Sequence, residues 1–144
     1  MARSLNALGA RYVVIGGFAI RAAGYDRRTM DIDLLIDTLL ENEACVLKAL
    51  EILPDKAARE VKPGEVSQYA VVRIADEIVV DLMKSAGPIG FEAACREINM
   101  HWLNGVPIPF ASPSLLLRMK TGTHREKDAL DLVFLNQLLA GEKH

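Results

Sequence analysis

The stretch that decides the fold runs from Val13 to Asp37, VVIGGFAIRAAGYDRRTMDIDLLID. It begins with a short apolar run that ends at Gly16-Gly17, and helical spacing of apolar residues follows. The segment 29–37 is rich in Ile and Leu but holds two acidic residues one position apart. This order predicts a buried strand, a glycine turn, a helix and a second strand.

The remaining sequence predicts further alternation of strands and helices. Asn104-Gly105 between apolar flanks predicts a β-hairpin, and Pro107 and Pro109 indicate an edge strand. Ser112 is the expected N-cap of a helix that begins near Pro113. The predicted strands cover 11–17, 29–37, 69–74 and 78–83, and the predicted helices cover 18–24, 40–53, 91–99, 113–120 and 127–139. We expect an α/β or α+β fold with a mixed β-sheet flanked by helices and with helices at the C-terminus.

Size and composition favour one ordinary globular domain over residues 1–144. The net charge of −2 gives no global basic field that would attract nucleic acid. Cys45 and Cys95 are far apart in the sequence and are expected to be reduced, buried thiols rather than a zinc site or a disulfide, as in a reducing compartment. With no signal peptide and no membrane span expected, the predicted location is the cytoplasm.

Three carboxylates form the candidate metal site. Side chains alternate along a strand, so Asp31 and Asp33 point to one face, with Cα atoms roughly 6.5–7 Å apart. Asp81 lies in a later apolar strand, and it can join them if the two strands are neighbours. Mg²⁺ prefers carboxylate oxygens, and three such groups can hold the two ions used for displacement at phosphorus. Gly16 and Gly17 would let a phosphate approach the backbone closely.

Each feature also has a purely structural interpretation. A diglycine is often only a turn, and an Asp-x-Asp at a strand end is often a solvated edge. Asp81 alone could be a charge that protects an edge strand from aggregation. The order of the three features along the chain favours the functional interpretation. Phe91, Tyr69 and Trp102 are expected to be core residues rather than surfaces for base stacking.

These motifs resemble the nucleotidyltransferase superfamily related to DNA polymerase β. The matching stretches are IGG at Ile15–Gly17, MDIDLLI at Met30–Ile36 and IVVDL at Ile78–Leu82. The stretch GYDRRTMDIDLLI is similar to small bacterial members, which include minimal nucleotidyltransferases and an abortive-infection toxin type. The later stretch ASPSLLLRMKTGTHREKDALDLVFL resembles motifs of the same branch. Many members carry serine where this chain has Gly17.

The resemblance implies transfer of a nucleoside monophosphate from an NTP, with release of pyrophosphate. It implies Mg²⁺, with two ions and Mn²⁺ as an alternative, held by Asp31, Asp33 and Asp81, and a role for Asp81 in deprotonating the acceptor hydroxyl. The remaining implied residues are Gly16, Gly17, Arg27, Thr29 and Lys120 for nucleotide phosphates, with Lys120 and Asp128 also in the catalytic set. Lys120 could equally be an exposed helix lysine, and Arg27 could simply pair with a nearby aspartate. Arg125, Lys127 and Asp131 also match the motif but rank below Lys120 and Asp128.

Several functions stay open at this point. The acceptor could be a tRNA, a protein or a small molecule, and the toxin-like branch allows a role in a toxin–antitoxin pair. The alternative is a nucleotide-binding or partner-binding module with this fold and little or no catalysis. A two-metal hydrolase is less favoured because the chain offers few histidines. A homodimer or a separate protein partner is compatible with either main hypothesis.

Overall fold

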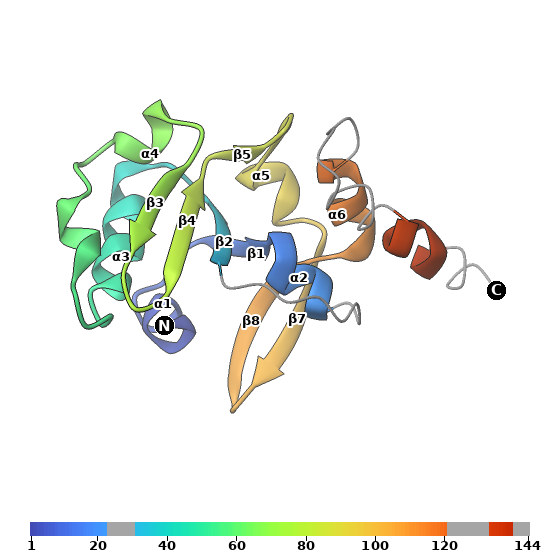
Figure 1. Cartoon of the computed structure of the whole chain (residues 1–144), viewed down its shortest axis with the longest axis horizontal. Coiled ribbons are helices and arrows are strands. Elements are labelled where there is room, and N and C mark those ends of the chain that lie inside the picture. The colour runs from blue at the N-terminus through green and yellow to red at the C-terminus, as the bar shows by residue number, and fades with distance from the viewer. Residues whose placement is uncertain (23–30, 121–132, 140–144) are drawn as a thin grey trace.

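A six-stranded mixed sheet organises the chain (Figure 1). The computed structural model describes residues 1–22, 31–120 and 133–139. The order of strands across this sheet is β3-β4-β2-β1-β8-β7. The strands are β1 (Tyr12–Ile15), β2 (Asp31–Ile36), β3 (Val72–Ala75), β4 (Val79–Met83), β7 (Ile98–Leu103) and β8 (Val106–Ala111), and a separate two-stranded sheet pairs β5 (Ser85–Ala86) with β6 (Ile89–Gly90).

The strand directions make the sheet mixed, as predicted. β1 runs antiparallel to β2 and parallel to β8, while β2 runs parallel to β4. β3–β4 and β7–β8 are antiparallel pairs at the two sides of the sheet. Strands that are far apart in the sequence are therefore neighbours at the centre, and hairpins complete both sides.

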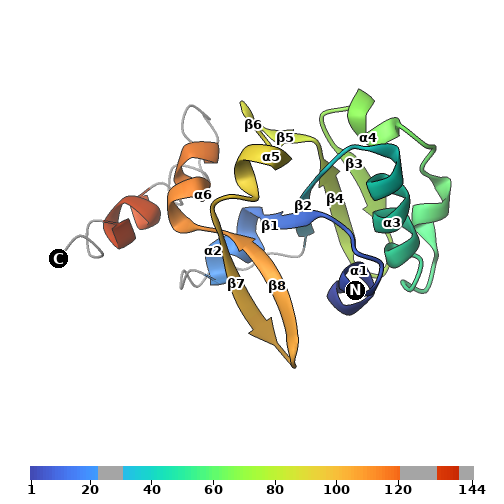
Figure 2. The same cartoon turned by 180° about the vertical axis from the view of Figure 1, so that it is seen from behind.

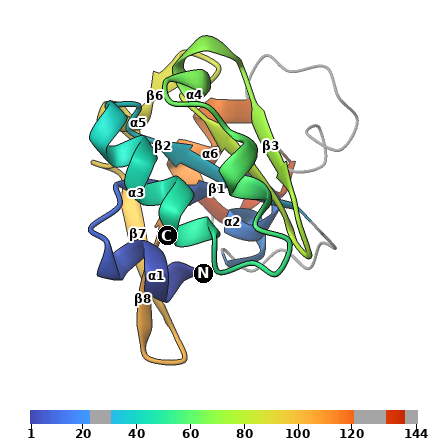
Figure 3. The ribbon, with the colours of Figure 1, turned by 90° about the vertical axis from the view of Figure 1, so that its left-hand side faces the viewer.

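Helices surround the sheet (Figures 1 and 2). They are α1 (Ala2–Ala7), α2 (Gly16–Ala22), α3 (Leu40–Leu50), the 3₁₀ helix η1 (Ala57–Glu60), α4 (Glu65–Gln68), α5 (Phe91–Ala94) and α6 (Pro113–Lys120), and residues 133–139 are also helical. Helices α3 and α4 gather near β3, and α2 and α6 lie toward the opposite end. In Figure 3, which looks from the β3 side, α1 and α3 lie next to each other. No helix in the described ranges combines the length and apolar character that a membrane-spanning segment needs.

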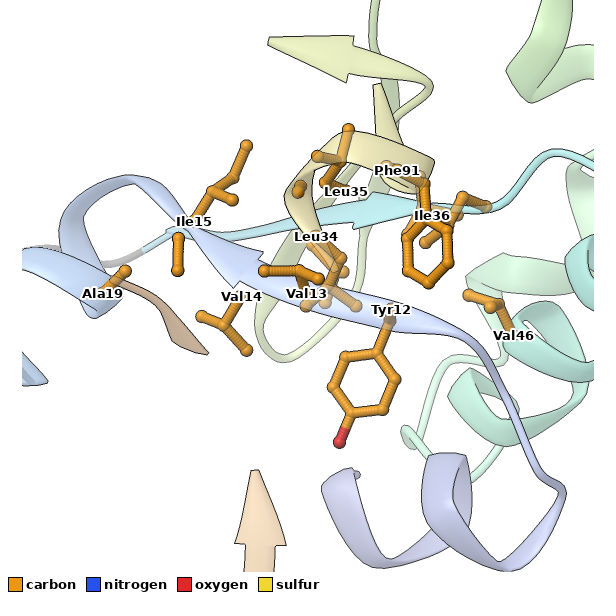
Figure 4. Packing of buried hydrophobic residues seen from close by; sticks show 14 of the residues in the cluster. Tyr12, Val13, Val14, Ile15, Ala19, Leu34, Leu35, Ile36, Val46 and Phe91 are labelled. Atoms are coloured by element: carbon orange, nitrogen blue, oxygen red, sulfur yellow. The ribbon is translucent and has the colours of Figure 1, made fainter. Parts of the chain in front are cut away.

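The hydrophobic core is centred on β1 and β2. All four residues of β1 are buried, as are the last three of β2. Figure 4 shows these two strands side by side, with Phe91 of α5 on one side and the ring of Tyr12 directed toward α1. The Tyr12 hydroxyl donates a hydrogen bond of 2.9 Å to Asn6 Oδ1 in α1. This packing places the diglycine directly after buried β1 and the Asp-x-Asp motif at the start of β2.

Two polar residues of α3 are buried because each is hydrogen-bonded. The side-chain amide of Asn42 donates to the backbone carbonyls of Arg11 and Asp37, which flank β1 and β2. The Glu43 carboxylate accepts hydrogen bonds from the backbone N–H groups of Gly64 and Val66 at the start of α4. These contacts fix α3 and α4 relative to the sheet and leave no uncompensated buried charge at Glu43.

Turn and capping signals are confirmed by the structure. Asn104 and Gly105 have φ values of 53° and 78°, the left-handed pair that a type I′ hairpin needs. The Leu115 N–H donates to Ser112 Oγ at 3.2 Å, so Ser112 caps α6 as expected. Helix α2 begins at Gly16, two residues before the predicted start. Both cysteines are free, as predicted, but each is half-buried rather than buried.

Two expectations about helices and strands are wrong. The predicted helix over 91–99 ends at Ala94, because Ile98 and Asn99 pair with β8 instead. The edge strand is β7, whereas the prolines lie in β8. Pro107 and Pro109 are tolerated there because β8 pairs with β1 only at Phe110, beyond both prolines.

Two of the three aromatic residues expected in the core are exposed. Tyr69 and Trp102 keep 55% and 67% of their surface accessible, and only Phe91 is buried. Trp102 lies near the tip of the β7–β8 hairpin, which projects from the body of the molecule in Figure 1. An aromatic residue in a protruding hairpin has no second layer against which to pack.

Candidate functional site

The diglycine turn is built around the carboxylate of Asp33. Strand β1 ends at Ile15, which pairs with Asp33 of β2, and Gly16 follows with a φ of +68°. A Cβ atom placed on Gly16 would lie 2.1 Å from Asp33 Oδ2 and 2.9 Å from its Cγ. The left-handed backbone and this close approach each require glycine. The first glycine of the motif therefore lets one carboxylate lie directly against the backbone between β1 and α2.

Asp81 lies beside Asp33 on the neighbouring strand. The parallel register of β2 and β4 pairs Asp33 with Asp81 and Asp31 with Val79. Paired residues project to the same face of a sheet, and so do residues two positions apart. Asp31, Asp33 and Asp81 are therefore on one face, and β2 and β4 are the neighbours that their convergence requires. The Asp81 side chain is only 8% exposed, compared with 42% for Asp31.

Arg73 contacts two of the three carboxylates, and the sequence analysis did not identify it. Its Nε donates to Asp81 Oδ1 at 2.9 Å and its Nη2 to Asp81 Oδ2 at 3.0 Å, a bidentate pair. The same Nη2 lies 3.3 Å from Asp31 Oδ2. The antiparallel register of β3 and β4 pairs Arg73 directly with Asp81, which brings the guanidinium onto the acidic face.

The sequence did contain a signal for this contact. The segment VRIADEIVVD has two apolar strands around Asp76-Glu77. A hairpin centred on Glu77 pairs residues equally distant from it, and Arg73 and Asp81 are both four positions away. Counting the register through the turn would have placed the arginine opposite the third aspartate.

The charge of Arg73 is stabilised by its acidic neighbours. The hydrogen bonds to Asp81, then the negative charge of Asp81 and that of Asp31, raise the pKa of Arg73 above its usual value. Asp33 makes a smaller contribution in the same direction. The guanidinium therefore keeps its positive charge beside Asp81 and Asp31.

An open groove of about 440 Å³ lies along β3, the edge strand nearest the acidic residues. Arg73 lines it together with Tyr69, Glu60 and Glu65. Arg73 thus belongs both to the groove and to the carboxylate cluster. Its side chain is 59% exposed, so it can change conformation without unpacking the core.

Asp31, Asp33 and Asp81 have the donor groups that a magnesium site needs, and all three lie on one face of the sheet. Carboxylate oxygens are the donors that Mg²⁺ prefers. Within residues 1–22, 31–120 and 133–139, however, no group of three or more acidic, histidine or cysteine side chains is arranged so that it could hold a metal ion. Two of the expected ligands, Asp31 and Asp81, are hydrogen-bonded to Arg73 instead.

The other predicted site residues fall partly outside the described chain. Gly17 is buried in the first turn of α2, and Lys120 is the last residue of α6. Arg27 and Thr29 lie outside the described residues, and so do Arg125, Lys127, Asp128 and Asp131. The structure thus brings together Gly16, Asp31, Asp33 and Asp81 from the predicted set and adds Arg73 to them.

Comparison with known proteins supports the fold. No protein-family model matches the sequence, and no curated protein is significantly similar to it. Among solved structures, the crystal structure of an antigenic nucleotidyltransferase-like protein from Paracoccidioides brasiliensis superposes with a TM-score of 0.60 at 19% sequence identity. The match covers 95% of this chain and 72% of that protein. With its mixed central sheet flanked by helices, the chain has a nucleotidyltransferase-like fold.

Proposed function

We propose that the protein is a metal-dependent nucleotidyltransferase that moves a nucleoside monophosphate from an NTP to an acceptor hydroxyl. The single observation that carries the proposal is the in-register pairing of Asp33 with Asp81 on adjacent parallel strands. Asp31 shares their face, and the diglycine turn holds Asp33 in place. This arrangement occurs on a fold whose solved neighbour is described as nucleotidyltransferase-like.

In the proposed reaction, the acceptor oxygen forms a bond to the α-phosphorus of the NTP. The bond between that phosphorus and the oxygen bridging to the β-phosphate breaks, and pyrophosphate leaves. Asp81 is proposed to take the proton of the acceptor hydroxyl. Mg²⁺, or Mn²⁺, would supply charge neutralisation at the phosphates when held by Asp31, Asp33 and Asp81.

The remaining residues are proposed to bind the triphosphate. Gly16 and Gly17 have no side chains, so phosphate oxygens can approach the backbone N–H groups. Lys120, Arg27 and Thr29 are proposed as further phosphate contacts, and Asp128 as a member of the catalytic set. These four assignments depend on the sequence resemblance alone.

The test of this proposal is NTP-dependent release of pyrophosphate by the purified full chain in Mg²⁺. Labelled ATP, GTP, CTP and UTP are each incubated with total RNA, with total protein and with no acceptor. We expect label on one acceptor class, and Asp33→Asn should lower the rate by on the order of 10²-fold. Asp55→Asn is the matched control because Asp55 is exposed and distant in sequence from the three carboxylates.

The identity of the labelled product decides the acceptor. Label in RNA indicates a tRNA-type acceptor, and label in protein indicates a protein hydroxyl. Growth arrest on expression of the wild-type chain but not of Asp33→Asn would support a toxin role. An absence of label with every NTP and every acceptor would contradict nucleotidyl transfer.

A nucleotide-binding module without catalysis is the second candidate, and the Arg73 contacts favour it. Two carboxylates that a metal would need are paired with a protein cation. Isothermal titration of ATP with Mg²⁺ separates the candidates. Binding without pyrophosphate release supports the module, whereas binding with release supports the enzyme.

A further inference from the structure

We propose that Arg73 is a built-in counter-cation that competes with a divalent metal ion for Asp31 and Asp81, and that metal binding displaces it into the adjoining groove. The proposal concerns regulation of the site described above and depends on that site binding a metal. It assigns a regulatory role to a residue that does not touch the reacting atoms.

Geometry and burial show why a cation is needed at this position. Asp81 is almost fully buried, and both of its carboxylate oxygens are hydrogen-bonded to Arg73, at 2.9 and 3.0 Å. A buried carboxylate without a partner is strongly unfavourable. The third contact, at 3.3 Å from Arg73 Nη2 to Asp31 Oδ2, joins the second carboxylate to the same cation.

The same contacts use the oxygens that a metal ion would need. Both oxygens of Asp81 and Oδ2 of Asp31 face the guanidinium. A metal ion at Asp31 and Asp81 and the guanidinium in its present position would place two cations on the same oxygen atoms. Repulsion between two cations on the same oxygen atoms disfavours binding of both at once, so metal binding at these two residues favours departure of Arg73.

Arg73 has room to leave its present position. More than half of its side chain is exposed, and it lines the groove along β3. Glu60 and Glu65 line the same groove and offer the displaced guanidinium new carboxylate neighbours. In this exchange, a divalent metal ion with charge +2 replaces the guanidinium with charge +1 between Asp31 and Asp81. The displaced guanidinium brings its positive charge to the groove. Metal loading and the electrostatics of the groove are thereby coupled.

The experiment measures metal binding directly rather than activity. The full chain and Arg73→Gln are titrated with Mn²⁺ alone, and free Mn²⁺ is followed by electron paramagnetic resonance. We expect Arg73→Gln to bind Mn²⁺ roughly three- to tenfold more tightly than the wild type, as loss of a competing, partly exposed ion pair predicts. Arg59→Gln is the matched control, because Arg59 is equally exposed and makes only a 3.8 Å ion pair, to Glu51; it should leave the affinity unchanged.

A second measurement keeps the test valid if Arg73→Gln folds poorly. In the wild type, the NMR signal of the Arg73 Nε–H group is assigned by its loss in Arg73→Lys. Addition of Mg²⁺ should shift this signal, because the hydrogen bond to Asp81 Oδ1 is lost. A signal that does not move while Mg²⁺ binds would overturn the proposal.

The outcomes separate this proposal from the proposed function. Equal Mn²⁺ affinity of the wild type and Arg73→Gln would refute competition and leave nucleotidyl transfer intact. Tighter binding by Arg73→Gln with no pyrophosphate release by any variant would support competition and contradict transfer. If no variant binds Mn²⁺ or Mg²⁺, both competition at Arg73 and the metal-dependent reaction are wrong.

Discussion

Substitution of Gly16 by alanine tests the geometry that holds Asp33. The new Cβ atom would lie 2.1 Å from Asp33 Oδ2, 2.9 Å from Cγ and 3.1 Å from its Cβ. Contacts this short cannot persist, so the carboxylate must turn away. The φ of +68° adds strain that any residue with a Cβ would feel.

The size of the effect follows from these two contributions. A left-handed backbone conformation costs a non-glycine residue about 1–2 kcal/mol. Forcing Asp33 from its rotamer adds about 0.5–1.5 kcal/mol. We therefore expect Gly16→Ala to lower the free energy of unfolding by about 1.5–3.5 kcal/mol. The measurement is urea denaturation followed by circular dichroism.

Gly9 provides a matched control for the backbone contribution. Its φ of +69° is nearly the same, and no atom lies within 4 Å of the position of its Cβ. Gly9→Ala should therefore lower the free energy of unfolding only by the backbone contribution, about 1–2 kcal/mol. In an Asp33→Ala background, the loss caused by Gly16→Ala should fall toward that of Gly9→Ala, which a double-mutant cycle measures. Equal losses for Gly9→Ala and Gly16→Ala in both backgrounds would refute the close approach of Asp33 to the turn.

Three further predictions concern stability. Burial raises the pKa of Tyr12 to about 12 from 10.0. The folded state therefore has its full stability below pH 10 and loses on the order of 3 kcal/mol as the pH rises toward 12. Absorbance at 295 nm should show one tyrosine ionising near pH 12 in the wild type and none there in Tyr12→Phe; a midpoint near 10 for all tyrosines would contradict this. Burial opposes the ionisation of Asp76, but hydrogen bonds from the backbone N–H groups of residues 57, 55 and 77 outweigh it and lower its pKa below 3.8. This stabilisation is present above pH 3.8 and is lost as the pH falls below it, so Asp76→Ala should lower the Tm at pH 7 more than at pH 3, and a pH-independent loss would contradict the assignment. Leu34 is fully buried, so Leu34→Ala should lower the free energy of unfolding, measured by urea denaturation, by about 2–5 kcal/mol. The same change at exposed Leu39 should lower it far less. Similar losses for the two variants would contradict the core assignment of Leu34.

Features set by neighbouring residues could be predicted from the sequence. The Asn104-Gly105 turn, the Ser112 cap and the diglycine turn each depend on a few adjacent residues, and the structure contains all three. The alternation of polar and apolar residues also placed Asp31 and Asp33 correctly on one face of a strand. Local chemistry fixes these features because short-range hydrogen bonds and φ preferences decide them.

Features that depend on distant pairing were harder to predict. The parallel neighbours β2 and β4 could only be assumed, because no local pattern indicates which strand pairs with which. The prolines of β8 indicated an edge, but the pairing of β7 displaced that strand from the edge. Hydrophobicity likewise did not distinguish buried Phe91 from exposed Trp102, since burial depends on which layers pack together. The contact of Arg73 with Asp81 depends on the register of the β3–β4 hairpin, which the turn at Asp76-Glu77 sets.

The pairing of Val14 with Phe110 has a consequence for how the chain reaches its native state. One edge of β1 pairs with β2, which follows it closely in the sequence. The other edge pairs with β8, which is almost a hundred residues further along the chain. Until the later strand arrives, a row of unsatisfied backbone groups on a fully apolar segment is open to any other extended chain. We expect refolding to be slow for a protein of this length and increasingly prone to intermolecular association at high concentration. Dilution during refolding should therefore raise the yield of native protein.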